Sequence, residues 1–147
     1  TIVINLNLVN VLVLEHYQTD NILYAFKISP EDEFSMRWTH SVELTPWEEI
    51  FKIDNNYNII LDRTKFKQFG AGVPDYAGTK TEIVDGYILF SGINQKMEFL
   101  PYGISDFAKH TFYFKDKELR LYELVNDGDR INIYTDKVSI IKYILNK

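Results

Sequence analysis

The chain contains no cysteine, few alanines and no long run of apolar residues. Without cysteine it can form neither a disulfide framework nor a thiolate zinc site, and it has no cysteine nucleophile. Its apolar opening stretch is interrupted by Asn5, Asn7 and Asn10. No segment therefore reaches the roughly 20 apolar residues that a helix needs to cross a bilayer. We expect a soluble chain with no transmembrane segment.

Positive charge is also scarce, because 16 Lys and Arg residues face 21 Asp and Glu residues and give a net charge of -5. Nucleic acids and anionic membranes are bound by clustered Lys and Arg side chains. The charge balance argues against a broad basic surface, and we expect no nucleic-acid partner.

Aromatic residues are abundant: the 147 residues include ten Phe, ten Tyr and two Trp, but four Ala. This composition favours half-buried strands over helices. Turn signals recur about every 8–12 residues, a spacing typical of sandwiches and barrels. We predict one all-β domain over residues 1–147, an antiparallel β-sandwich or partly open barrel of about ten strands. The helical spacing of Val138, Ile141 and Leu145 predicts a short C-terminal helix.

Three dipeptides predict tight turns between strands: Asn55-Asn56, Asp85-Gly86 and Asp127-Gly128. Asn and Asp tolerate positive φ, and a following Gly adopts it without steric cost. We expect the third turn to form a hairpin that joins the strand around Leu119 to the strand around Ile131.

The pairing of two strands in residues 34–53 follows if residues 43–46 form a four-residue loop. The predicted pairs are Val42 with Trp47, His40 with Glu49, Trp38 with Phe51, and Met36 with Ile53. Most of these pairs are apolar, so this face is predicted to be buried. A buried carboxylate is costly unless it is paired, and the imidazole opposite it could become cationic. The sequence thus predicts a His40–Glu49 pair.

A two-residue turn at Asn55-Asn56 would place Asp62 opposite Glu49. His40, Glu49 and Asp62 would then form a row across three strands. An imidazole and two carboxylates could bind a divalent cation or transfer a proton. The alternative is a buried polar ladder that fixes the register of the strands, and we favour it over a metal or catalytic site.

Two blocks carry a family likeness: RWTHSVELTPWEEIF at residues 37–51 and FKQFGAGVP at residues 66–74. In their order and separation they resemble the bacterial domain-of-unknown-function family numbered 1850, and the likeness extends from Val11 to about Ile133. The resemblance implies an extracytoplasmic protein, at the cell surface or in the periplasm, often encoded beside tripartite TAXI-type transporters. It implies no reaction and no functional residues. Because the chain starts at Thr1, a removed N-terminal segment could serve as a membrane anchor.

The glycine loop of the second block is a candidate anion site. Gly70 and Gly72 permit positive φ, so backbone N–H groups there could converge on a small organic anion. Antiparallel pairing should return this loop to the end of the sheet near residues 45–46. The candidate ligand-binding residues are His40, Ser41, Glu43, Thr45, Glu49, Gly70, Ala71 and Gly72. The alternative is a tight loop that packs over the edge of the sheet.

Three functions follow from these observations. We favour a non-enzymatic accessory or small-ligand-binding module that works with a tripartite organic-acid transporter and needs no cofactor. One alternative is a metal-dependent or acid/base enzyme that uses His40, Glu49 and Asp62. The other is a structural interaction module with no pocket. A hydrolase dyad of His40 and Ser41 is disfavoured because adjacent strand residues point to opposite faces.

Overall fold

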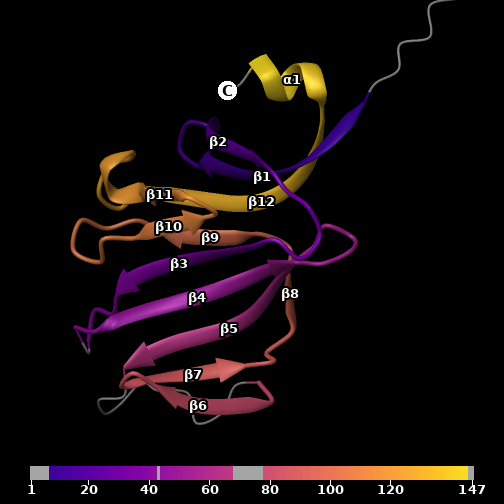
Figure 1. Cartoon of the computed structure of the whole chain (residues 1–147). Helices are drawn as coiled ribbons and strands as arrows, with labels where there is room; N and C mark the ends of the chain where they lie inside the picture. The colour runs from indigo at the N-terminus through magenta and orange to yellow at the C-terminus, as the bar shows by residue number, and fades with distance from the viewer. Residues whose placement is uncertain (1–6, 43, 68–77, 146–147) are drawn as a thin grey trace, which may run out of the picture.

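The computed structural model of the chain describes residues 7–42, 44–67 and 78–145. These residues form twelve strands, one 3-10 turn and one short α-helix, and the paired strands are antiparallel (Figure 1). The strands belong to two sheets in a sandwich-like arrangement that does not close into a barrel. The predicted all-β fold and the short C-terminal helix are both confirmed.

The smaller sheet has the strand order β2-β1-β12-β9. Its strands are β1 (Leu8–His16), β2 (Asn21–Lys27), β9 (Leu100–Gly103) and β12 (Arg130–Ser139). Helix α1 (Ile140–Leu145) follows β12 directly and lies on the side of β1 away from the larger sheet (Figure 1).

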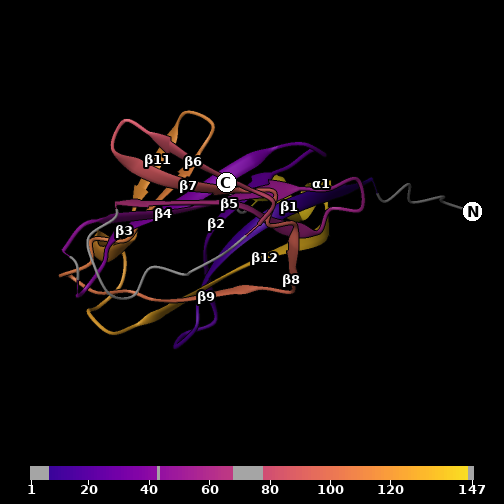
Figure 2. The same ribbon diagram turned by 90° about the horizontal axis from the view of Figure 1, so that it is seen from below.

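The larger sheet has the order β11-β10-β3-β4-β5-β7-β6, and β8 also pairs with β5. Its strands are β3 (Glu33–Thr39), β4 (Pro46–Ile53), β5 (Ile59–Lys67), β6 (Lys80–Val84), β7 (Tyr87–Ser91), β8 (Gln95–Met97), β10 (Thr111–Phe114) and β11 (Lys117–Arg120). The 3-10 turn η1 (Leu121–Glu123) follows β11. In the view from below, β9 and β12 lie on one side of β3, β4 and β5 (Figure 2).

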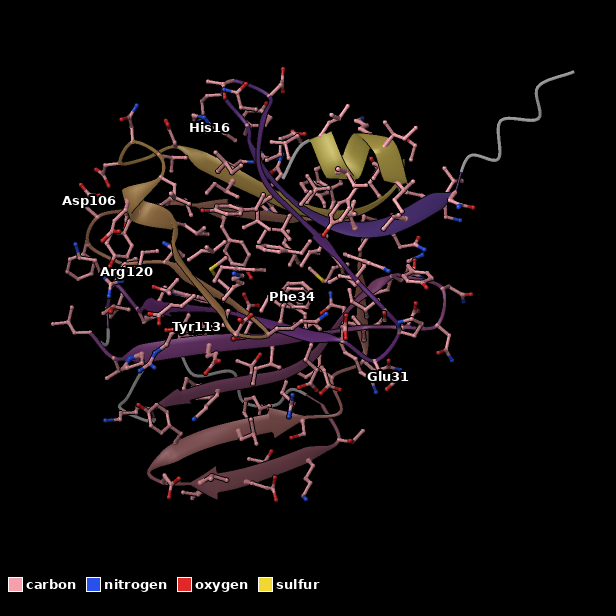
Figure 3. All side chains as sticks on the ribbon, turned by 45° about the horizontal axis from the view of Figure 1, so that its top comes forward. His16, Glu31, Phe34, Asp106, Tyr113 and Arg120 are labelled. Carbon is pink, nitrogen blue, oxygen red and sulfur yellow. The ribbon has the colours of Figure 1, made fainter. Side chains whose placement is uncertain are left out.

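The main apolar core lies between the two sheets. Phe34 of β3 is 2% exposed and stacks on Phe51 of β4, with the ring centroids 5.0 Å apart. Its ring points between the sheets, whereas His16, Asp106 and Arg120 lie at the periphery (Figure 3). From the smaller sheet, β1, β9 and β12 contribute aliphatic side chains to the same core: Leu12, Leu14, Leu100, Ile131 and Ile133. One continuous core therefore joins the two sheets.

The middle of strand β1, residues 11–14, is apolar because both of its faces are covered there. Leu12 and Leu14 face the core between the sheets. Val11 and Val13 belong to a second cluster on the opposite face, against which Tyr143 of α1 packs. Burial on both faces removes the usual alternation of apolar and polar residues. No helix in the described part of the chain is long and apolar enough to cross a membrane.

The predicted register of β3 and β4 is wrong. The strands pair Trp38 with Trp47, Met36 with Glu49, and Phe34 with Phe51. This register places aromatic rings opposite each other at two positions, and such cross-strand pairs stabilise a sheet. The connecting loop spans residues 40–45 rather than 43–46. Because the register differs by an even number of positions, each side chain keeps its predicted face.

The predicted register of β4 and β5 is also wrong. Glu49 lies opposite Thr64, and Asp62 is the extra residue of a β-bulge between Leu61 and Arg63. The Asp62 carboxylate lies 3.0 Å from Nε of Arg63, in an ion pair without hydrogen-bond alignment. The row of His40, Glu49 and Asp62 does not form.

Two other turn predictions have different outcomes. Asp85 and Gly86 join β6 to β7 with φ values of 51° and 81°, so this predicted hairpin is confirmed. The predicted hairpin at Asp127-Gly128 is wrong, because β11 pairs with β10 in the larger sheet and β12 with β1 and β9 in the smaller. The turn residues there connect two sheets instead of two neighbouring strands.

We expect Asp54→Ala to lower the free energy of unfolding by about 1 kcal/mol. The Asp54 carboxylate accepts hydrogen bonds from the backbone N–H of Asn56, the backbone N–H of Asn58 and the Asn58 amide. The backbone hydrogen bond from Asn58 is the main cause that lowers the pKa of Asp54. The stabilisation is therefore present at neutral pH and is lost as the pH falls through this lowered pKa. Urea unfolding at several pH values measures the effect.

The matched control is Asn56→Ala, which keeps the backbone N–H that Asp54 binds. We expect it to be less destabilising than Asp54→Ala. Equal losses for the two variants, with no dependence on pH, would contradict a role for the carboxylate.

Candidate functional site

A cavity of about 510 Å³ lies at the end of the β3–β4 hairpin. Strand β3 and the loop that follows it, strand β4, and the segment before β10 each contribute residues to its lining. The lining residues are Trp38, Thr39, His40, Ser41, Trp47, Glu49, Ala108 and His110. Segments about 70 residues apart in sequence are thus brought together around one space.

Backbone hydrogen bonds hold these segments at fixed positions. The N–H of Thr39, the last residue of β3, donates to the carbonyl of Ala108 at 2.8 Å. In the β3–β4 loop, the N–H of His40 donates to the Thr45 carbonyl, and the N–H of Leu44 donates to the His40 carbonyl, each at 2.9 Å. These bonds fix the β3–β4 loop and the segment around Ala108 relative to the sheet.

A row of aromatic rings crosses the strands beside the cavity. Trp38 on β3 stacks on His110 on one side, with centroids 5.9 Å apart, and on Trp47 of β4 on the other, at 6.3 Å. Trp47 in turn stacks on Phe66 of β5 at 4.7 Å. The His40 ring lies 5.4 Å from that of Trp47. The rings stand side by side across the sheet and cover much of each other's faces.

Glu49 is the acidic group of the cavity. Its Oε1 accepts a hydrogen bond of 2.9 Å from the hydroxyl of Tyr102 on β9, which links the larger sheet to the smaller one. Burial raises the pKa of Glu49, and the hydrogen bond from Tyr102 only partly opposes this effect. Burial and the nearby carboxylate raise the pKa of Tyr102 far above its ordinary value, so this hydroxyl remains protonated and acts as a donor.

The two histidines of the cavity differ in burial. His110 is 8% exposed, and its Nδ1 has no hydrogen-bond partner among the residues described. Burial lowers the pKa of His110, which favours a neutral ring. His40 lies in the β3–β4 loop, and its Nδ1 accepts the backbone N–H of Val42 at 3.3 Å.

The structure brings together part of the predicted ligand-binding set. His40, Ser41 and Glu49 all line the cavity. Thr45 is not among the lining residues and contacts the loop through its carbonyl. Glu43 lies outside the described residues, as do Gly70, Ala71 and Gly72. Strand β5 does end at Lys67, beside the start of β4, so the chain leaves the sheet at this end.

The predicted partner of Glu49 is wrong. Glu49 binds Tyr102 rather than His40, because His40 lies beyond the last residue of β3, in the loop. The candidate metal set of His40, Glu49 and Asp62 is also not formed, and the described residues contain no group of three His, Cys, Asp or Glu side chains that could hold a metal ion.

Sequence reasoning missed Tyr102 and His110. Tyr102 is 53 residues from its hydrogen-bond partner, and its strand belongs to the other sheet. His110 precedes β10, which pairs with β3 and so places the histidine beside Trp38. The sequence signal for His110 is its position directly before the aromatic residues of β10.

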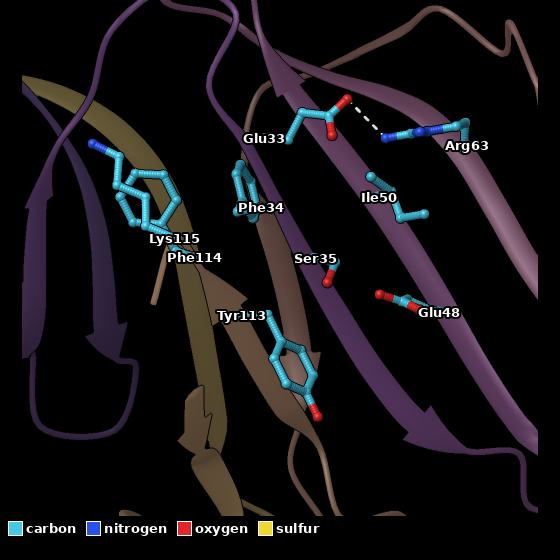
Figure 4. Close-up of a pocket in the computed structure, with 9 residues that line it drawn as sticks. All are labelled: Glu33, Phe34, Ser35, Glu48, Ile50, Arg63, Tyr113, Phe114 and Lys115. Atoms are coloured by element: carbon cyan, nitrogen blue, oxygen red, sulfur yellow. Dashed lines mark hydrogen bonds and ion pairs between the residues drawn. The ribbon is translucent and has the colours of Figure 1, made fainter. Parts of the chain in front are cut away.

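A second hollow of about 290 Å³ lies on the opposite face of β3 and β4 (Figure 4). Ser35, Glu48 and Ile50 line it, with Tyr113 from β10. Its Arg63 donates a hydrogen bond of 2.7 Å to Glu33 (Figure 4). The first cavity is the stronger candidate because it is larger and contains the buried carboxylate of Glu49.

A third polar arrangement lies at the β1–β2 turn. His16 binds the Asp129 carboxylate through Nε2 at 2.8 Å and the Thr19 hydroxyl through Nδ1 at 2.9 Å. Thr19 Oγ1 also accepts the backbone N–H of Asn21. These bonds close the turn and tie it to the chain before β12.

Comparison with known families identifies the central part of the chain. A family described as a domain of unknown function, DUF1850, matches residues 34–121. The chain belongs to the DUF1850 family. The matched region runs from β3 to the first residue of η1 and contains every residue that lines the cavity, as well as Tyr102. It is shorter than the predicted likeness, which ran from Val11 to about Ile133, because the match begins within β3 and ends at Leu121.

No curated protein and no solved structure matches this DUF1850 chain. The description of the family assigns no activity.

We expect Glu49→Gln to raise the melting temperature at neutral pH. A folded-state pKa that is raised by burial means that the neutral carboxyl is favoured in the fold. The corresponding stability is full at low pH and is lost as the pH rises through the raised pKa. Glutamine stays neutral and can still accept the Tyr102 hydrogen bond. The gain should therefore shrink on acidification, as shown by melting curves across the acidic and neutral range.

A Glu49→Gln variant that melts below the wild type at neutral pH would contradict this account. It would indicate that the ionised carboxylate is stabilised in the fold.

Proposed function

We propose that this DUF1850 domain is a small-ligand-binding module and that the ligand occupies the cavity at the end of the β3–β4 hairpin. The observation that carries the proposal is that two tryptophans and a desolvated carboxylate converge on one space of about 510 Å³. Small-molecule sites are typically concave, apolar spaces of roughly 300–1,000 Å³ with a few placed polar groups.

A purely structural role explains less of this site. The Tyr102–Glu49 hydrogen bond alone could serve to align the two sheets. It does not require a cavity beside Glu49, and an interaction module without a pocket would be expected to fill that space with side chains. Nδ1 on the buried ring of His110, which has no hydrogen-bond partner among the described residues, also costs stability without structural benefit. Ligand binding explains both the cavity beside Glu49 and the hydrogen-bonding capacity of His110 that the described residues leave unused.

Binding is also favoured over catalysis. The enzyme hypothesis required His40, Glu49 and Asp62 to share one row, and Asp62 instead occupies a bulge beside Arg63. His40 and Ser41 both line the cavity, but Ser41 is exposed in the turn after β3. An acid and two imidazoles remain, which are sufficient for recognition by hydrogen bonding.

We further propose that the protein works outside the cytoplasm, at the cell surface or in the periplasm, as an accessory to a tripartite transporter of small organic acids. The support is the resemblance of residues 37–51 and 66–74 to a family that is often encoded beside such transporters. In this scheme the cavity would hold a regulatory small molecule.

Ser41→Phe should block ligand binding without unfolding the protein. Ser41 lines the cavity and is exposed, so a phenyl ring there can enter the space without disturbing the core. We expect compounds that raise the melting temperature of the wild type to lose at least about tenfold in affinity for this variant, since a displaced contact of about 1.4 kcal/mol has that effect. Calorimetric titration of such compounds measures the change.

Val42→Phe is the matched control, because Val42 is 74% exposed and is not among the lining residues. Equal loss in the two variants, or no stabilising compound in a broad metabolite screen, would contradict the proposed site.

The location is tested in cells that produce the natural protein. We expect a C-terminally tagged copy to fractionate with the membrane or the periplasm and to co-purify with a transporter component after cross-linking. A tagged protein found wholly in the cytosolic fraction would contradict this part of the proposal while leaving ligand binding unaffected.

A further inference from the structure

We propose that the cavity beside Glu49 takes a protonated amine, which donates a hydrogen bond to the Glu49 carboxylate, and that it discriminates against carboxylates. This inference rests on the proposed binding function and names the chemical class of the ligand. It reverses the charge expected for an anion at Gly70–Gly72, residues that lie outside the described part of the chain.

The charges around the cavity carry the inference. Of its lining residues that the structure describes, Glu49 is the acid, and none is Lys or Arg. A bound carboxylate would lie near Glu49 with no cation from these residues to compensate it, and like charges in a partly desolvated site repel strongly. An ammonium group instead supplies the missing countercharge.

The two histidines do not reverse this balance. His110 is buried, which disfavours its cationic form. Nδ1 of His40 accepts the backbone N–H of Val42, so this nitrogen is not a donor to a bound anion. The Tyr102 hydroxyl, which donates a hydrogen bond to Glu49, is also neutral.

The aromatic row indicates which kind of cation fits. Quaternary ammonium ions are usually held against open ring faces. Here Trp47 stacks on Phe66, and Trp38 on His110, so much of these faces is already covered. The attraction must therefore come mainly from Glu49, whose carboxylate has accepting capacity beyond the bond to Tyr102. A primary amine, with N–H groups to donate, fits better than a quaternary one.

Proton release should accompany binding. Burial favours the protonated form of Glu49 in the empty cavity, whereas an ammonium ligand favours the carboxylate. Affinity for the amine should rise with pH through the raised pKa of Glu49 while the amine stays protonated. The titratable groups around Glu49 are Tyr102, whose pKa is raised, and the two histidines that line the cavity, His40 and His110. Burial lowers the pKa of His110.

The protein carries its own reporter for this test. Its two tryptophans, Trp38 and Trp47, both line the cavity, so intrinsic tryptophan fluorescence reports this site. The probes are benzylamine, benzyl alcohol, benzoate and benzyltrimethylammonium, which share one ring and differ in charge and in N–H groups. Titrations at pH 7.5 and at pH 5 give the dissociation constants.

We expect benzylammonium to bind at least about tenfold more tightly than benzoate at pH 7.5, with benzyl alcohol between them. Benzyltrimethylammonium should bind more weakly than benzylammonium, and benzylammonium should weaken at pH 5. Glu49→Gln should abolish the preference for benzylammonium over benzyl alcohol. The matched control is Glu48→Gln, which removes a carboxylate from the adjacent residue on the opposite face of β4 and should keep the preference.

The outcomes separate this inference from the function on which it rests. Benzoate binding as tightly as benzylammonium, or equal loss of preference in Glu48→Gln and Glu49→Gln, would overturn the amine assignment and leave a ligand cavity in place. Equal affinity for the quaternary probe would overturn the N–H donation to Glu49. Failure of all four probes to alter the fluorescence would overturn the amine assignment, and the same failure across the metabolite screen would overturn the binding function.

Discussion

The pairing of β3 with β4 is the constraint on which the rest of the site depends. Two aromatic cross-strand pairs, Trp38 with Trp47 and Phe34 with Phe51, fix this register. With those pairs in place the hairpin must end at Thr39 and Pro46, and the residues between them form a loop. The loop, together with the tryptophan pair, forms one side of the cavity.

The same register decides the chemistry of Glu49. It places the carboxylate on the inner face of β4, opposite Met36 and next to Thr64, where no cation on a neighbouring strand faces it. The Tyr102 hydroxyl from the smaller sheet is then its hydrogen-bond donor. A single hydrogen bond stabilises a desolvated carboxylate only in part, which is why the pKa of Glu49 remains raised. A ligand that donates a further hydrogen bond to this carboxylate would therefore stabilise its ionised form.

Much of the fold could be predicted from the sequence because it depends on local patterns. The all-β class follows from composition, the β6–β7 hairpin from Asp85-Gly86, and the inner face of β3 from the alternation of Phe34, Met36 and Trp38. The register could not be predicted, because alternation defines a face but leaves the length of the loop open. The bulge at Asp62 has no local signal either. The assignment of β11 and β12 to different sheets depends on long-range pairing that a turn dipeptide does not encode.

In the candidate site, too, local patterns could be predicted from the sequence and long-range contacts could not. His40, Ser41 and Glu49 were found because they share a hairpin, whereas Tyr102 and His110 reach the site through the pairing of distant strands. The central claim is that Glu49 is a desolvated carboxylate inside a ligand cavity. Its most direct test is a carbon-detected NMR titration of the glutamate carboxyl groups, with and without benzylamine. The account predicts that Glu49 titrates above the ordinary range of glutamate and shifts downward when the amine binds. A Glu49 that titrates like a solvent-exposed glutamate and does not respond to the amine would contradict it.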